Sequence, residues 1–179
     1  LATASGFPGH GSFGLALRIH QALTAGDQSA WIYWQLADGK PVAAQTLTDA
    51  DIRAESPKYV ALKHYARFIR PGSVRAGIDV QGDSNILASA YWHAPDQAMT
   101  WVVLNGRPVS EPIRILLPAN PPPSSTYLLV RSAEGSLWQQ ATLTPAAGQL
   151  SFTLPAYGVA TVSDSPGIDS IFTDGFEVP

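Results

Sequence analysis

The sequence contains no cysteine and few charged residues. Of its 179 residues, 14% are charged and only four are glutamates. Without cysteine there are no disulfides, thiolate metal ligands or cysteine nucleophiles. The chain has 11 basic and 14 acidic residues, a formal net charge of -3, so it offers no basic surface to neutralise nucleic-acid phosphates or to hold an anionic membrane. These absences argue against nucleic acid or a membrane as a partner.

Long apolar runs are also missing, and the first residues do not show the pattern of a signal peptide. No stretch of about 18 apolar residues occurs, so the sequence predicts no membrane-spanning helix. The chain begins at Leu1 rather than at methionine, and residues 1–14 lack the basic start and apolar stretch of a signal peptide. We therefore expect the chain to be processed, or to begin within a longer protein.

What the sequence does contain is typical of a packed globular protein. Apolar residues make up 45% of the chain, and 15 glycines and 15 prolines supply many turns. This apolar content excludes a globally disordered chain. The length is too small for a complete eight-stranded α/β barrel, which needs about 250 residues. We expect one domain, or two small ones.

The first part of the chain, residues 1–72, predicts helices beside a buried strand. Apolar side chains recur at three- and four-residue steps over residues 13–25, which indicates a helix with Gly26 as its C-cap. Residues 30–36 read AWIYWQL and predict a strand buried on both faces, as in a parallel sheet.

A polar stretch and a second helix follow. Residues 37–55 are longer than a usual strand-to-helix connection and form a candidate functional loop. The second helix begins at Ser56, which suits the N-cap, and at Pro57, which suits the first helical position. Residues 71–72, Pro-Gly, end it.

The rest of the chain alternates between short apolar runs and turns. Eight strands are predicted, at residues 74–80, 86–93, 101–105, 112–117, 126–130, 137–141, 150–154 and 158–162. This spacing is typical of an antiparallel β-sandwich. The sequence thus predicts an α+β chain in three parts, which are residues 1–72, 73–163 and an acidic tail, 164–179.

No catalytic or metal-binding motif is present, and we expect neither a metal nor a cofactor. The four histidines lack metal-site spacing, and His20 and His64 are expected to pack as ordinary helix residues. Hydrolysis of a glycoside needs two carboxyl groups, but none of the glutamates ends a barrel-like strand. Asp38 follows the aromatic strand and could face a site, although a turn residue beside Gly39 is the simpler interpretation.

The aromatic strand supplies the candidate binding residues, Tyr33, Trp34 and Gln35. Aromatic rings stack on the C–H faces of sugars, and an amide can bind hydroxyls as both donor and acceptor. Trp34 and Gln35 stand nearest the carboxyl end of the strand, where barrel sites are built. For Trp31 and Tyr33, packing in the core is an equally good interpretation.

Two segments resemble glycoside hydrolase family 30, a group of endo-xylanases and related glycosidases. ALRIHQALTAGDQSAWIYWQL and SPKYVALKHYARFIRPGSVR are similar to its C-terminal barrel segment. ILASAYW, WVVLN and FTLPAYGVATV look like strands of the β-domain beside that barrel. The resemblance covers residues 14–162. It implies the end of a (β/α)8 barrel followed by an antiparallel β-sandwich side domain.

The resemblance also implies a function. The family consists of retaining glycosidases with a glutamate acid/base and a glutamate nucleophile, which implies a secreted bacterial enzyme acting on xylan or a related β-linked polysaccharide. The nucleophile would precede the helix that begins near Phe13, yet no glutamate occurs before Glu55. Both catalytic residues would then lie upstream of Leu1. We therefore expect this chain to hold no catalytic residue and to be inactive alone.

The resemblance assigns roles to the aromatic segment and to the residues after it. Trp34 matches the family's sugar-contacting tryptophan, Gln35 stands where xylanases often have tyrosine, and Tyr33 matches an aromatic neighbour. Members specific for glucuronoxylan carry arginines just after this strand, where Ala37 and Asp38 stand here. Because the Asp38 carboxylate would repel a uronate, the parent enzyme is not expected to require glucuronic acid side groups.

A non-catalytic, polysaccharide-binding or structural β-sandwich is the alternative function. A flat sugar platform needs several exposed aromatic residues on one face, yet Trp92, Trp101 and Trp138 are scattered through apolar strand patterns and are expected to be mostly buried. One barrel strand beside two helices also leaves open edges. We therefore expect non-specific self-association, with residues 30–36 paired irregularly or poorly ordered.

Overall fold

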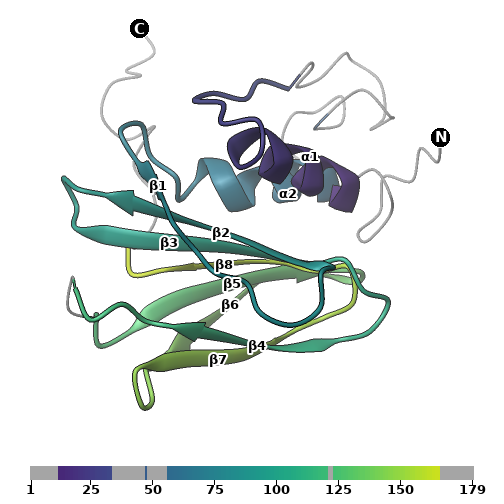
Figure 1. Ribbon diagram of the computed structural model, residues 1–179. Helices are drawn as coiled ribbons and strands as arrows, with labels where there is room; N and C mark the ends of the chain where they lie inside the picture. The colour runs from purple at the N-terminus through teal and green to yellow at the C-terminus, as the bar shows by residue number, and fades with distance from the viewer. Residues whose placement is uncertain (1–11, 34–46, 48–55, 121–122, 166–179) are drawn as a thin grey trace, which may run out of the picture.

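Two helices lie on one face of a six-stranded sheet, and a two-stranded sheet covers the opposite face (Figure 1). The computed structural model describes residues 12–33, 47, 56–120 and 123–165. Among these residues, no helix has the length and apolar character needed to cross a bilayer.

The helices come first along the chain, as α1 (Gly14–Leu23) and α2 (Pro57–Ala66). The strands are β1 (Val74–Ala76), β2 (Ile86–His93), β3 (Ala98–Asn105), β4 (Glu111–Leu116), β5 (Tyr127–Ala133), β6 (Ser136–Leu143), β7 (Gln149–Leu154) and β8 (Val159–Ser163). The larger sheet has the order β1-β2-β3-β8-β5-β6, and β4 pairs with β7. All of these pairs are antiparallel, which confirms the α+β class.

All eight predicted strands are present, although several have different ends. Strand β2 has its predicted bounds. Strand β1 ends at Ala76 rather than at residue 80, because it pairs only with the last part of β2, up to Ala90. Strand β3 begins at Ala98 rather than at residue 101, because the β2–β3 turn places Ala98 directly opposite His93.

Helix α2 begins as predicted. Ser56 Oγ accepts a hydrogen bond from the Tyr59 N–H at 3.1 Å, and Pro57 occupies the first turn. The Ser56 hydroxyl also donates to Leu47 O. After the helix, Gly72 adopts a φ of 87°, which favours glycine over any residue with a β-carbon.

The prediction for the end of α1 is wrong. The helix ends at Leu23, and the residue with left-handed backbone is Asp27, with a φ of 46°. Gly26 is required for another reason, because a β-carbon there would lie 2.9 Å from Ala22 O. Close approach of the backbone, and not a left-handed cap, therefore explains this glycine.

The predicted doubly buried strand is not formed in its described part. Residues 30–33 have no regular secondary structure, and the remainder of 30–36 lies outside the described residues. Trp31 and Tyr33 pack against the core on the helix side, whereas Ile32 is 90% exposed. Burial of a strand on both faces needs paired neighbours, and no described strand pairs with these residues.

Strand β3 is buried on both faces because each face of the large sheet has its own core. Val102 and Leu104 pack with the helices, whereas Trp101 and Val103 pack with β4 and β7. The two-residue period of a strand sends alternate side chains to opposite cores. A continuous apolar run therefore marks this strand in the sequence.

A buried histidine joins α2 to the sheet. His64 Nδ1 lies 3.0 Å from Thr161 Oγ1 on β8, and Nε2 lies 2.8 Å from Ser132 Oγ on β5. Thr161 Oγ1 donates to His64 O, while Ser132 Oγ accepts from the Trp138 N–H. The single Thr161 hydrogen goes to His64 O, so Thr161 accepts from Nδ1–H. Complete burial opposes a second proton on the ring, so Nε2 accepts the Ser132 hydrogen. The ring is therefore neutral, with its proton on Nδ1.

The environment of both helix histidines agrees with this neutral state. Burial, and secondly the positive charge of Lys63, lower the pKa of His64 to about 3. Burial also lowers the pKa of His20. Both side chains are buried in the packed face of their helix, as predicted.

His64 should make folding stability depend on pH. The unfolded chain takes up a proton there near pH 6.5, whereas the folded chain does so only near pH 3. The contribution of His64 to stability is therefore complete above pH 6.5 and falls as the pH drops, by up to about 1.4 kcal/mol per pH unit. Urea unfolding between pH 7 and pH 4 measures this slope.

The variant His64→Gln removes the titrating group. It should flatten the slope, leaving the part that His20 contributes, and lower the free energy of unfolding at pH 7 by about 1–3 kcal/mol. Exposed Arg114 provides the control, because Arg114→Gln should preserve the slope. An unchanged slope in His64→Gln would contradict a neutral, buried ring.

Candidate functional site

Tyr33 is the one predicted sugar-binding residue that the structure describes. Trp34, Gln35 and Asp38 lie outside the described residues. Tyr33 is half-buried and stacks on Trp31, with ring centroids 5.9 Å apart. Burial raises the pKa of its hydroxyl. Sugar binding by these residues stays a prediction.

The described residues do not place two free carboxyl groups at the end of a barrel strand. Glu111 begins β4 and forms an ion pair with Arg107, and Glu134 lies exposed in the β5–β6 turn. Glu55 and Glu177 lie outside the described residues. In the same described part, no three His, Asp or Glu side chains gather in a way that could hold a metal ion.

The loop after β3 carries an ion-pair network. Arg107 Nε lies 3.2 Å from Asp83 Oδ2, and its Nη1 contacts Glu111 Oε1 at 2.5 Å. Hydrogen bonds from Asn85, with a smaller effect of Arg107, lower the pKa of Asp83. Arg107 therefore pairs with two carboxylates at once. This arrangement suits the binding of polar groups better than proton transfer at neutral pH.

Asn105 fixes this loop against the turn between β7 and β8. Its side chain is fully buried, and Nδ2 donates to Val109 O at 2.8 Å and to the carbonyls of residues 154–155 at 3.1 and 2.9 Å. The Arg107 N–H donates to Asn105 Oδ1 at 3.0 Å, and the Tyr157 N–H donates to Arg107 O at 3.1 Å. These hydrogen bonds hold the two loops side by side.

Tyr157 is the one aromatic residue among the exposed large hydrophobic side chains of the described residues. It is 37% exposed, and its ring meets Phe13 edge-on with centroids 5.9 Å apart. Trp101 is buried as predicted, whereas Trp92 and Trp138 are half-buried. The described strands therefore present no flat row of exposed aromatic rings.

Asn105, Arg107 and Tyr157 were not among the residues predicted from the sequence. The signals in the sequence were two glycines, because Gly106 follows the polar Asn105 and Gly158 follows the aromatic Tyr157. A β-carbon on Gly106 would lie 3.0 Å from a backbone oxygen, and one on Gly158 would lie 2.8 Å from another. Such close approaches mark ordered turns, but the sequence does not show that the two turns meet.

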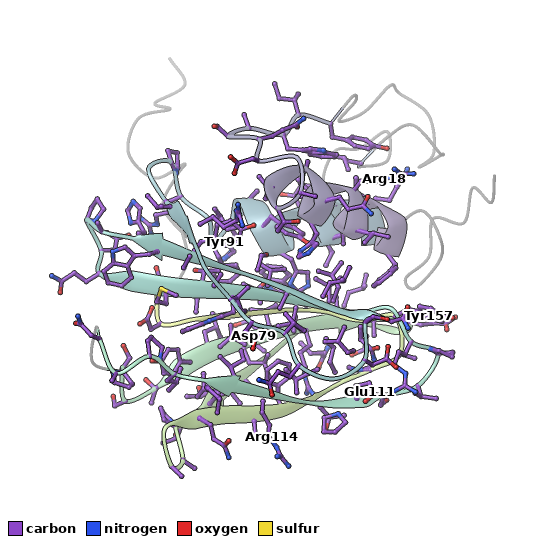
Figure 2. The ribbon with its side chains drawn as sticks, viewed as in Figure 1. Arg18, Asp79, Tyr91, Glu111, Arg114 and Tyr157 are labelled. Carbon is purple, nitrogen blue, oxygen red and sulfur yellow. The ribbon has the colours of Figure 1, made fainter. Side chains whose placement is uncertain are left out.

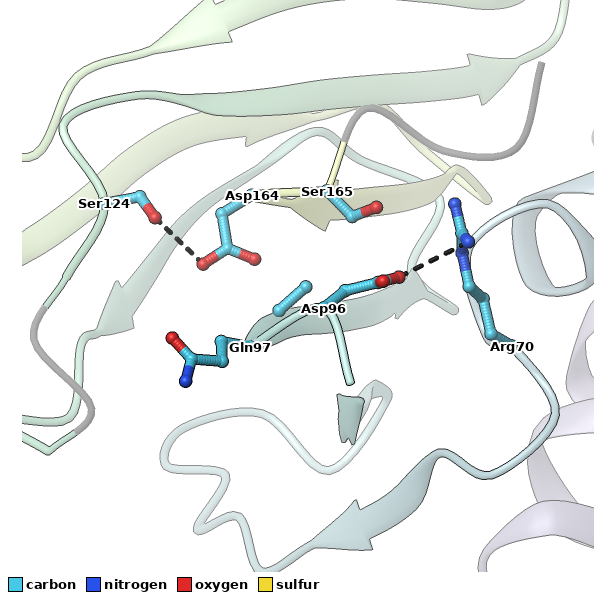
Figure 3. Close-up of a pocket in the computed structure, with 7 residues that line it drawn as sticks. Arg70, Asp96, Gln97, Ser124, Asp164 and Ser165 are labelled. Carbon is cyan, nitrogen blue, oxygen red and sulfur yellow. Dashed lines mark hydrogen bonds and ion pairs between the residues drawn. The ribbon is translucent and has the colours of Figure 1, made fainter. Parts of the chain in front are cut away.

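A polar cavity of about 370 Å³ lies at the other end of β3 (Figure 3). Its lining residues are Arg70, Asp96, Gln97, Ala98, Ser124, Asp164 and Ser165.

The carboxylates of this cavity already have partners. Arg70 Nη1 lies 3.3 Å from Asp96 Oδ2. Asp164 accepts the Met99 N–H at 2.7 Å and the Ser124 hydroxyl at 3.0 Å. Among the described residues, no aromatic side chain lines the cavity. Its polar groups therefore connect the end of β8 to the start of β3, a structural role.

Comparison with known proteins gives matches among solved structures, whereas no protein-family model and no curated protein sequence matches the chain. A family 30 endoxylanase from Clostridium papyrosolvens C71 matches 84% of this chain with a TM-score of 0.73 and 20% identity. The catalytic domain of family 30 xylanase C from Talaromyces cellulolyticus matches 90% with a TM-score of 0.71 and 24% identity. A conserved exported protein from Bacteroides fragilis matches 85% with a TM-score of 0.61 and 20% identity.

These matches establish the fold. The chain has the fold of part of a glycoside hydrolase family 30 xylanase, which confirms at the level of fold the resemblance seen in the sequence. It spans 37% of the length of each of the two xylanases and 34% of the exported protein. The chain therefore corresponds to only a part of each of those structures.

The hydrogen bonds of Asp164 predict a measurable stability effect. Asp164→Ala leaves the Met99 N–H and the Ser124 hydroxyl without their acceptor, and should lower the free energy of unfolding by about 1–3 kcal/mol. Asp79 is an exposed carboxylate (Figure 2), and Asp79→Ala serves as the control with a clearly smaller effect. Urea denaturation at pH 7 measures both, and equal losses would refute the structural role.

Proposed function

We propose that this chain is the C-terminal portion of a secreted, retaining glycoside hydrolase of family 30 that acts on xylan or a related β-linked polysaccharide. The match in fold to two family 30 xylanases over 84% and 90% of the chain carries this proposal. The name of the exported protein that the chain also matches supports export.

In this proposal, residues 1–72 are the end of a (β/α)8 barrel, residues 73–163 are the side domain and residues 164–179 are a tail. Helices α1 and α2 would be barrel helices, with the aromatic segment 30–36 between them in the sequence. The packing of both helices against one core supports this assignment, and residues 30–36 would form a strand only beside the neighbouring strands of a complete barrel.

The proposed division of roles follows from the side chains. Trp34, Gln35 and Tyr33 contact the sugar, and the two catalytic glutamates lie upstream of Leu1. The position of Glu111 supports this view, since its carboxylate is committed to Arg107. A binding module with a flat aromatic platform has less support, because the described strands expose no row of aromatic rings.

The proposal is tested by comparing two proteins. The purified 179-residue chain should release no reducing sugar from xylan, because in this proposal both catalytic glutamates lie upstream of Leu1. The complete reading frame should release sugar, and NMR should show first products that keep the β-configuration, as double displacement requires. Replacing either of its two strand-terminal glutamates by glutamine should remove this activity. Hydrolysis by the short chain alone would contradict the proposal.

Substrate choice should not depend on glucuronic acid. Asp38 stands where glucuronoxylan-specific members carry arginine, and its carboxylate would repel a uronate. The complete enzyme should therefore cleave unsubstituted xylo-oligosaccharides as readily as glucuronoxylan, with products resolved by mass spectrometry. The variant Asp38→Arg should shift the preference toward glucuronoxylan. Cleavage restricted to bonds beside glucuronosyl branches would refute this prediction.

A further inference from the structure

We propose that Tyr157 and the Arg107 network form an accessory subsite for a neutral saccharide, at the end of the molecule where α1 begins. The inference rests on the proposed function, because it takes a β-linked polysaccharide as the ligand. It concerns residues in the loops after β3 and β7, which are remote in sequence from Trp34 and Gln35.

The exposure of Tyr157 is the first observation. Its ring remains partly open to solvent while its edge contact with Phe13 fixes one side. Val109 is 47% exposed on the loop that Asn105 holds beside the Tyr157 turn. Two apolar side chains thus stand exposed on two adjacent, tightly hydrogen-bonded loops. A rigid exposed ring can stack on a sugar at a small entropic cost.

The polar groups beside the ring are the second observation. Figure 2 shows Tyr157 and Glu111 at the same end of the molecule, and the Tyr157 N–H bonds Arg107 O. The side chains of Arg107, Asp83 and Glu111 are 35%, 33% and 20% exposed. A guanidinium carries five N–H donors and each carboxylate carries several acceptor positions. The network can therefore bind sugar hydroxyls both as hydrogen-bond donor and as acceptor.

The charge of this network selects the ligand. Two carboxylates surround a single guanidinium, so an acidic saccharide would be repelled. A neutral xylan or glucan segment fits this environment better than a uronate-bearing segment.

The position relative to α1 is the third observation. Phe13, which touches the Tyr157 ring, directly precedes the helix. In a (β/α)8 barrel the helices begin at the face where the active site is built. If α1 is a barrel helix, the Tyr157 turn lies at that face. The side domain would then contact a polysaccharide that extends beyond the barrel cleft.

The test is an NMR titration of the isotopically labelled 179-residue chain with xylohexaose. We expect the largest amide shifts at Arg107, Val109, Tyr157 and Gly158. Tyr157 has a φ of 48°, which asparagine tolerates better than most residues, so Tyr157→Asn removes the ring and retains the turn. We expect this variant to bind about tenfold more weakly. Tyr157→Phe should bind as the parent chain does, and so should a control at a distant exposed apolar residue, Leu116→Ala.

Three results would overturn the subsite. They are an absence of shifts at these amides, unchanged affinity in Tyr157→Asn with a preserved spectrum, and tighter binding of a glucuronate-bearing oligosaccharide than of xylohexaose. The hydrolase proposal is judged separately, by the activity of the complete reading frame. A chain that fails to bind xylohexaose therefore overturns the subsite alone, and an inactive reading frame overturns the hydrolase proposal alone.

Discussion

One neutral imidazole ring couples helix α2 to the sheet. His64 is fully buried, and both ring nitrogens bond hydroxyls on the neighbouring strands β8 and β5. Ser132, one of these partners, also accepts a hydrogen bond from the Trp138 N–H. Trp138 has a φ of 56°, and the register of β5 and β6 shifts between Arg131 and Ala133. Lys63 of α2 lies 4.3 Å from the centre of the Trp138 ring. Loss of the ring would leave the buried Ser132 hydrogen without its acceptor, so the contact of α2 with the sheet and the irregular register of β5 and β6 meet at Ser132.

Fixing the helices on the sheet also fixes which loops meet them. At one end of β3, Asn105 positions the turn that brings Tyr157 against Phe13, just before α1. At the other end, Asp164 accepts hydrogen bonds from Met99 and from Ser124, which joins the end of β8 to the start of β3 and to a loop. The two ends of the sheet therefore differ. One end exposes an aromatic ring beside charged groups, and the other ends in a cavity whose carboxylates are already paired.

Features set by neighbouring residues could be predicted from the sequence, whereas features set by distant packing could not. Ser56 and Pro57 act within one helical turn, and the bounds of β2 follow from its apolar run. Residues 30–33 were misassigned because burial on both faces depends on strands that do not pair with them here. Tyr157 was missed because its importance comes from Asn105 and Phe13, which are about 50 and 140 positions away and meet it only after folding.

The shared core limits how the chain can be divided. Ile19 and Tyr65 of the helices occupy the same buried cluster as Val102, Leu104 and Val159 of the sheet. Separating the helices from the sheet would expose these side chains to water, at roughly 1.5–3 kcal/mol for each large side chain. The boundary predicted at residue 72 therefore separates a helical part from a strand-rich part that share one core. In a barrel enzyme, such a side domain would stabilise the last helices directly, so the loops that contact Phe13 would keep a fixed position at the barrel face.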